Sequence, residues 1–222
     1  MAPIMRPLRW PTADAAVMSA STVLVAAAVI VLSADLGPQA RHMGWHILAM
    51  NFVAPLVAAI VAARRQIQDT RPLGLWISTV IQIAAIWIVH APSVQTFAIA
   101  VPAAQLAIHA ALLAAAFWFW LHLLCLPGAR RWHGLLALLL TGKLVCLLAV
   151  LLVFAPRSLY GTGHGHAASL PSLDDQHLAG LLMIVACPLS YLTAGIVIAV
   201  RLVCRDDIAD AAVVRKPVHS VG

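Results

Sequence analysis

The residues of this sequence that are most able to do chemistry are ten histidines, and two of them share a pattern with a methionine. His42, His46 and Met50 follow one another at intervals of four residues. On an α-helix this spacing puts the three side chains on one face, and each step moves about 6 Å along the axis. Imidazole and thioether groups are ligands that suit copper, and the thioether favours the cuprous ion. The pattern therefore indicates a copper site.

Further groups of the same kind lie in other apolar segments of the chain. His90 ends one segment, and His109 lies in the next, one helical turn after Gln105. In the last apolar segment a second stripe runs at spacings of four, three and four residues, and it comprises Gln176, Gly180, Met183 and Cys187. The start of this stripe is crowded by Asp174, Asp175 and His177. These groups can form one site only if the helices that carry them meet.

The composition indicates that these elements belong to a membrane protein. Of the 222 residues, 63% are hydrophobic and only 10% are charged, whereas a soluble domain carries roughly 25% charged residues. The net charge of +6 does not indicate nucleic acid binding, because the basic residues lie singly or in pairs between apolar segments and form no basic stripe. The four cysteines show neither a CxxC nor a zinc spacing, so a disulfide framework is not expected.

The expected fold class is all-α, a polytopic transmembrane helical bundle of about six spans. Apolar segments of spanning length lie at about 15–33, 43–63, 73–90, 98–124, 134–155 and 177–201. We interpret residues 15–33 as a retained span, because this segment is long for the core of a signal peptide and is followed by a poor cleavage site. Residues 1–222 are expected to form a single membrane domain, with residues 202–222 as a short cytoplasmic tail.

The distribution of lysine and arginine predicts the orientation of these spans. Eleven of the basic residues lie on one side of the predicted membrane, and only Arg41 and Arg157 lie on the other. Because positively charged loops favour the cytoplasm, both termini are expected there, with the loops near 35–42, 91–97 and 156–176 outside. The outer side then carries His42, His46, His90, His109 and His177.

Each of these histidines also has a plain structural interpretation. A histidine at a membrane interface can anchor a helix end through a headgroup or a carbonyl oxygen, and the sulfur-containing residues can be packing residues. His164 and His166, in the segment GTGHGHA, are expected to be solvated. His46 and His109 fit this interpretation less well, because polar groups at their depth are unfavourable unless they face the bundle interior and find partners. We therefore expect a shared site on the outer side.

Lys143 lies deep inside a predicted span. It is nine residues from the cytoplasmic end of that span, or about 14 Å at helical rise, which is too far for its side chain to reach water easily. We expect a partner inside the bundle, which the sequence does not identify.

Three segments of the chain resemble a known family, the CtaG-type cytochrome c oxidase assembly factors. The run RHMGWHILAMNFVAPLVA is similar to the family pattern His-Met-x-x-His…Met-x-x-x-Ala-Pro. HAPSVQTFAIA, followed by His109 and the FWFW run, resembles the third and fourth core helices of the family. LDDQHLAGLLM resembles its Asp-Gln-x-x-Ala-Gly-x-x-Met pattern. The segments occur in family order and together cover about residues 40–202.

The resemblance implies a multi-span membrane protein that is needed to build active haem–copper oxidases, with copper delivery as the usual interpretation. It implies cytochrome c oxidase subunits and the lipid bilayer as partners, no nucleic acid, and a location in the bacterial inner (plasma) membrane. With His177 added from the residue pattern, the candidate metal ligands are His42, His46, Met50, His90, His109, Asp175, Gln176, His177 and Met183. Gln105 departs from the family pattern, because a second histidine would lie at that position.

We therefore expect an assembly factor that binds copper transiently at an outer His/Met site and passes it on. We expect no enzymatic activity, because the sequence shows no nucleophile–base pair and no phosphate-binding loop. Three alternatives remain open. One is a haem protein with His46 and His109 as axial ligands. The second is a metal or proton transporter, which should carry ionisable groups through the midplane. The third is a metal-free assembly scaffold.

Overall fold

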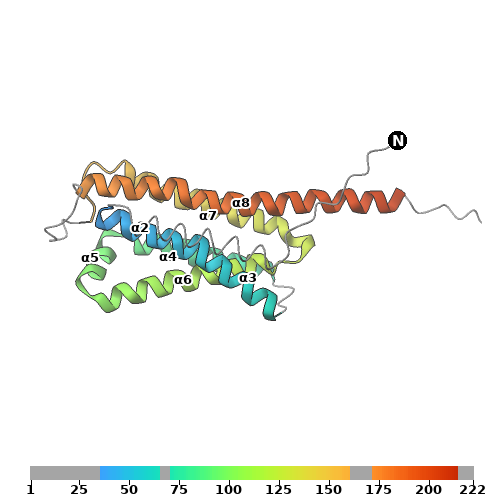
Figure 1. Cartoon of the computed structure of the whole chain (residues 1–222), viewed down its shortest axis with the longest axis horizontal. Coiled ribbons are helices and arrows are strands. Elements are labelled where there is room, and N and C mark those ends of the chain that lie inside the picture. The colour runs from blue at the N-terminus through green and yellow to red at the C-terminus, as the bar shows by residue number, and fades with distance from the viewer. Residues whose placement is uncertain (1–35, 66–70, 161–171, 215–222) are drawn as a thin grey trace, which may run out of the picture.

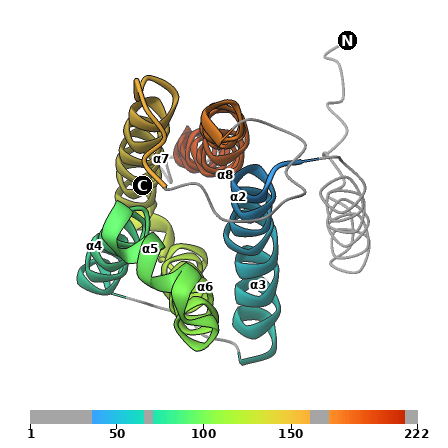
Figure 2. The same cartoon turned by 90° about the vertical axis from the view of Figure 1, so that its left-hand side faces the viewer.

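The computed structural model describes residues 36–65, 71–160 and 172–214, and within these ranges the chain is helical and contains no strand. The helices are α2 (Pro38–Leu48), η1 (Ala49–Val53), α3 (Ala54–Arg65), α4 (Pro72–Val89), α5 (Pro92–Ala100), α6 (Pro102–Leu124), η2 (Gly128–Arg130), α7 (Arg131–Val153) and α8 (Ser172–Val214). Figure 1 shows the long helices lying roughly parallel, and Figure 2 shows the same bundle from one end. The all-α class is confirmed.

Five helical segments in the described part are long and apolar enough to cross a membrane. They are Pro38–Arg65, Pro72–Val89, Pro102–Leu124, Gly128–Val153 and Leu173–Val200. They coincide with five of the six segments expected from the sequence. The sixth, residues 15–33, lies outside the described residues, so the count of six and the orientation of the termini stay predictions.

One difference from the expected boundaries is the short helix α5. Residues 92–97 were expected to form an outer loop and residues 98–101 the start of a span. Instead the chain forms α5, turns at Val101, which has extended backbone angles (φ −128°, ψ 99°), and begins α6 at Pro102. A proline disfavours the helical conformation in the residue before it, and it is well suited to the first turn of a helix. Pro92 and Pro102 therefore divide this region into two helices.

The end of α8 extends beyond the predicted span. Residues 202–222 are expected to form a tail, and the first part of this segment is helical, because α8 continues to Val214. The apolar candidate span ends at Val200. Figure 1 shows the last part of α8 projecting past the ends of the other helices. Helical structure therefore continues after the apolar sequence stops.

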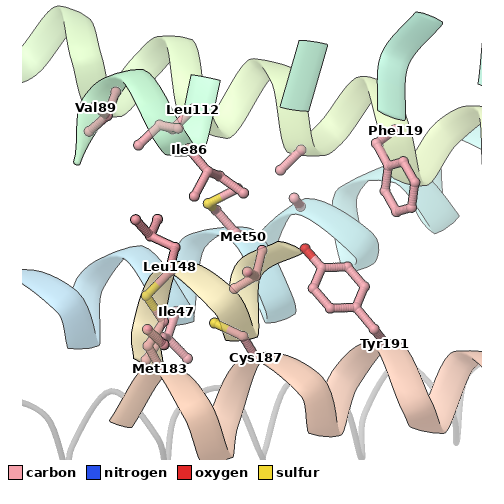
Figure 3. Packing of buried hydrophobic residues seen from close by; sticks show 14 of the residues in the cluster. Ile47, Met50, Ile86, Val89, Leu112, Phe119, Leu148, Met183, Cys187 and Tyr191 are labelled. Carbon is pink, nitrogen blue, oxygen red and sulfur yellow. The ribbon is translucent and has the colours of Figure 1, made fainter. Parts of the chain in front are cut away.

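The bundle is held together by a buried apolar core from several helices, while many other apolar side chains face outward. In the core, α7 packs along α8, α2 packs against α8, and α6 packs against both α3 and α4. Figure 3 shows Met50, Ile86, Phe119, Met183 and Tyr191 meeting in this core. Large apolar side chains remain exposed on the outer faces of the helices. Such an apolar exterior suits a protein whose surroundings are lipid.

Gly180 lies at a close approach between α7 and α8. A Cβ atom there would lie 2.6 Å from Cγ2 of Val153 and 3.1 Å from the carbonyl oxygen of Ala149. Small residues allow such close approach of helix backbones in membranes. Gly195, on the same helix, would meet no atom within 4 Å.

These two glycines make a matched pair for a stability test. We expect Gly180→Ala to destabilise the protein by about 1–3 kcal/mol through overpacking. We expect Gly195→Ala to be neutral or to stabilise it by about 0.5–1 kcal/mol, because alanine loses less backbone entropy in a helix. Thermal unfolding of the purified full-length protein in detergent measures both. Equal melting temperatures for the two variants would contradict the packing described for α7 and α8.

Candidate metal centre

The helix that carries His42 and His46 is anchored at its start by Asp175 of α8. The Asp175 carboxylate accepts hydrogen bonds from the backbone N–H groups of Gln39 (2.8 Å) and Ala40 (3.0 Å). These N–H groups have no partner within the helix, so the carboxylate acts as a cap supplied by another helix. A Cβ at Gly37 would overlap this carboxyl group, so any other residue there would displace the Asp175 side chain. Asp175 therefore fixes the position of the first turn of α2.

Gln176 and Tyr160 hold the ends of the neighbouring helices. The Gln176 side chain is fully buried; its Oε1 accepts from the backbone N–H of Leu159 (2.7 Å), and its Nε2 donates to the Leu152 carbonyl oxygen (3.2 Å). The Tyr160 hydroxyl donates to the His90 carbonyl oxygen (3.0 Å). Burial raises the pKa of Tyr160 to about 12, so this hydroxyl stays protonated at neutral pH. The ends of α4, α7 and α8 are thus tied together beside α2.

Three histidines meet at this end of the bundle. His42 and His46 come from α2 and His109 comes from α6, and one ring nitrogen of each lies within 4.8 Å of the others. The Nε2 atoms of His42 and His46 are 2.8 Å apart. Two nitrogens bound to one metal ion at about 2.0–2.1 Å each are separated by roughly 3 Å. The histidine triad, as we call these three residues, therefore has a spacing that suits a shared metal ion.

The tautomer of His109 leaves Nε2 free to bind a metal ion. Its Nδ1 lies 2.6 Å from the Gln105 carbonyl oxygen, one turn earlier on α6. A carbonyl oxygen only accepts, so Nδ1 carries the proton and Nε2 keeps a lone pair. Metal-binding imidazoles are commonly oriented in this way, by a hydrogen bond from the nitrogen that does not bind the metal to a carbonyl oxygen. Gln105, which replaces the histidine of the family pattern, thus orients the His109 ring through its backbone carbonyl oxygen.

His90 lies next to the triad, and like His109 it has Nδ1 close to the carbonyl oxygen of the residue one turn earlier. Its ring centre is 5.9 Å from that of His46, and its Nδ1 lies 2.7 Å from the Ile86 carbonyl oxygen. Its Nε2 is buried and has no hydrogen-bond partner among the described residues. A buried polar atom without a partner is unfavourable, which indicates that a water molecule or a ligand belongs there.

A small cavity continues inward from the triad, and sulfur atoms are prominent in its lining. Its volume is about 20 Å³, enough for about one water molecule or ion. The residues with ligand atoms that line it are Met43, His46, Met50, Asn51, His90, Met183 and Cys187. Figure 3 labels Met50, Met183 and Cys187, which line the cavity from two helical segments. Imidazole, thioether and thiol groups are a soft ligand set.

A distortion of the helix beside this cavity shapes the site. Residues Ala49–Val53 form a π-helix, which is a feature often found at functional sites. In this register the Met50 carbonyl oxygen would accept from residue 55, but Pro55 has no N–H. The indole Nε1 of Trp120 donates to that oxygen instead, at 3.1 Å. The freed backbone group thus binds α6 to the helical segment that follows His42 and His46.

The structure divides the predicted ligands into three groups. The first, the histidine triad, is His42, His46 and His109. The second lines the cavity and comprises Met50, His90 and Met183. The third comprises Asp175, Gln176 and His177, which neither join the triad nor line that cavity. In this group Asp175 and Gln176 hold backbone atoms, and the half-buried His177 has an Nε2 without a partner in the described part of the chain.

Sequence reasoning did not single out Met43 and Asn51 as site residues. Met43 precedes Met50 by seven residues, two helical turns, so the two share a face, and this spacing could have indicated it. Asn51 lies within the π-helix, and its Nδ2 donates to Cys187 Sγ at 3.5 Å. Its place in the cavity depends on the altered helical register, which the sequence pattern did not indicate.

Apolar helices of spanning length that bring three partly buried histidines together define a polytopic membrane protein with a candidate metal centre. The family model of the cytochrome c oxidase caa3 assembly factor (Caa3_CtaG) matches residues 4–205, and the chain belongs to this family. The resemblance found in three segments of the sequence is thereby confirmed. No curated protein and no solved structure matches the chain.

Proposed function

We propose that this protein binds copper transiently through His42, His46 and His109 and aids its delivery to a haem–copper cytochrome c oxidase during assembly. The observation that carries the proposal is the histidine triad, in which three ligand nitrogens from two helices lie within 4.8 Å of one another. Membership of the oxidase assembly family supplies the recipient. The role is one of binding and transfer, so no catalytic step is proposed.

The ligand set favours copper over harder cations. Calcium and magnesium prefer oxygen ligands, but the nearby carboxylate of Asp175 is engaged by two backbone N–H groups. Neutral imidazoles suit cupric, cuprous and zinc ions, whereas thioethers select the cuprous ion. Met50 and Met183 in the adjoining cavity therefore support cuprous copper as the cargo.

A site built across two helices also suits a carrier that must release its cargo. His42 and His46 share α2, but His109 comes from α6. A small shift of α6 against α2 would remove one ligand of three and leave the other two in place. Release then needs only a local helix movement rather than unfolding.

The proposed site faces the outer side of the membrane. Arg64 and Arg65 end α3, and Arg71 precedes α4, so these charges lie at the opposite end of their helices from His42 and His90. Positive charges favour the cytoplasmic side. This orientation puts the triad at the outer leaflet of a bacterial inner membrane.

The haem alternative fits the ring geometry poorly. The rings of His46 and His109 are nearly parallel, 9° apart, with centres separated by 4.7 Å. Axial ligands of a haem point their nitrogens at the iron from opposite faces of the macrocycle, and two stacked imidazoles at this separation leave no space for it. The geometry therefore supports a bare ion.

Metal analysis of the purified full-length protein tests the proposal. After loading with cuprous ions under reducing conditions and removal of excess metal, we expect the protein to retain about one copper ion per chain, as a single three-histidine site implies. The visible spectrum should lack a Soret band. A stoichiometric Soret band would establish the haem alternative instead, and a protein that retains no copper would support the metal-free scaffold.

A further inference from the structure

Lys143 occupies an unusual place near the middle of the span Gly128–Val153. Its side chain is exposed rather than enclosed by the bundle. It has neither an ion pair nor a hydrogen-bond partner among the described residues, so the expectation of a partner inside the bundle is wrong for that part of the chain. A lysine at this depth is unfavourable in lipid, and intramembrane charges are usually paired.

Lys143 is also too deep to reach either membrane surface. It lies twelve residues after the start of α7 and ten before its end, or about 18 Å and 15 Å along the axis. Its side chain spans roughly 6 Å. A lipid headgroup at the surface therefore leaves a gap of several ångströms on either side, and the counter-charge must come from within the apolar layer.

Lys143 lines an open groove between α7 and α8. The groove has a volume of about 420 Å³, and its lining includes Leu138, Lys143, Cys146, Pro188, Tyr191 and Leu192. Among the residues that the structure describes, Lys143 is the one charged residue in this lining. The walls therefore suit an apolar occupant that carries one negative charge.

Two glycines, Gly142 and Gly195, also line the groove, and packing within the described chain does not explain them. A Cβ on Gly142 would meet only the Cβ of Tyr191, at 3.9 Å, and one on Gly195 would meet nothing within 4 Å. This differs from Gly180, where a Cβ would overlap α7. Small residues on an outer helix face allow the backbone of another helix to approach closely.

We propose that this groove binds a transmembrane helix of a partner protein that carries an aspartate or glutamate near its middle. Neither the described spans nor residues 15–33 can supply that helix. In the described candidate spans the acidic residues are Asp174 and Asp175, at the first turn of α8, and residues 15–33 contain none. A second copy would therefore leave Lys143 without a counter-charge. The proposal does not depend on copper binding.

The test uses the purified full-length protein in phosphatidylcholine vesicles and a labelled synthetic transmembrane peptide of leucine and alanine. One peptide carries a central aspartate, and its control carries asparagine at the same position. By energy transfer, we expect the aspartate peptide to bind at least about tenfold more tightly. In the variant Lys143→Met this preference should disappear. Gly195→Leu, which fills the groove but keeps the charge, should weaken binding of the aspartate peptide.

A charge exchange completes the test and distinguishes loss of the charge from misfolding of the variant. Lys143→Asp should reject the aspartate peptide and bind a peptide with a central lysine, which only a folded groove can do. Equal binding of the aspartate and asparagine peptides to the unmodified protein would overturn the proposal. So would unchanged discrimination in Lys143→Met. Binding of anionic lipid that depends on Lys143, with no peptide binding, would assign the groove to lipid and also overturn it.

Discussion

The double variant His42→Ala/His46→Ala is expected to lose affinity for cuprous copper by about a hundredfold or more. The two imidazoles supply two of the three nitrogens that meet at the site, and their Nε2 atoms are only 2.8 Å apart. His109 alone cannot hold an ion against competing ligands. Competition with a chromogenic cuprous chelator measures the affinity of the purified full-length protein.

His133→Ala provides the matched control for this variant. His133 lies near the start of α7, accepts a hydrogen bond from Trp76 Nε1 (3.4 Å) and stacks on Trp132. It is a partly buried histidine on a helix, like His42, but it lies outside the triad. Its loss should therefore leave the copper affinity nearly unchanged. An equal decrease in both variants would mean that the copper measured is bound elsewhere.

Loss of His46 is expected to reduce cytochrome c oxidase activity in cells strongly, and added copper should restore part of it. His46 is 4% exposed and lies on a rigid helix between His42 and the cavity. Mass action refills a weakened site when its ligand is abundant, so a carrier defect responds to copper supply. Oxidase activity of cells grown at low and at added copper measures the effect in His46→Ala.

The comparison variant for this experiment is His164→Ala. His164 lies between glycines in GTGHGHA, outside the residues that the structure describes. Glycine loses more conformational freedom than any other residue when its backbone is held in one conformation, so a metal ligand between two glycines is entropically unfavourable. Loss of His164 should have a smaller effect than loss of His46. Equal loss of activity in both variants, with no response to copper in either, would favour a scaffold that carries no metal.

The sequence predicted the helix faces well, because helical spacing is a local property. The four-residue interval between His42 and His46 implies a shared face, and the cost of a buried imidazole implies that His109 turns inward. All three residues meet in the triad. Five apolar segments were also located closely, since length and hydropathy suffice for that.

The sequence could not predict contacts that depend on how one helix lies against another. Asp175 and Gln176 belong to a family pattern that makes them candidate ligands, yet their oxygens accept hydrogen bonds from backbone N–H groups. That arrangement requires the start of α2 to lie beside α8, which no local pattern encodes. The outward position of Lys143 depends likewise on the rotation of α7 in the bundle.

X-ray absorption spectroscopy of the copper-loaded full-length protein, compared with His109→Ala, tests the central claim most directly. The account predicts nitrogen neighbours at about 2.0 Å with the multiple-scattering pattern of imidazole, and one imidazole fewer in the variant. Sulfur neighbours in addition would fit occupation of the adjoining cavity. A copper environment without imidazole, or one that is unchanged by the loss of His109, would contradict a carrier site built on His42, His46 and His109.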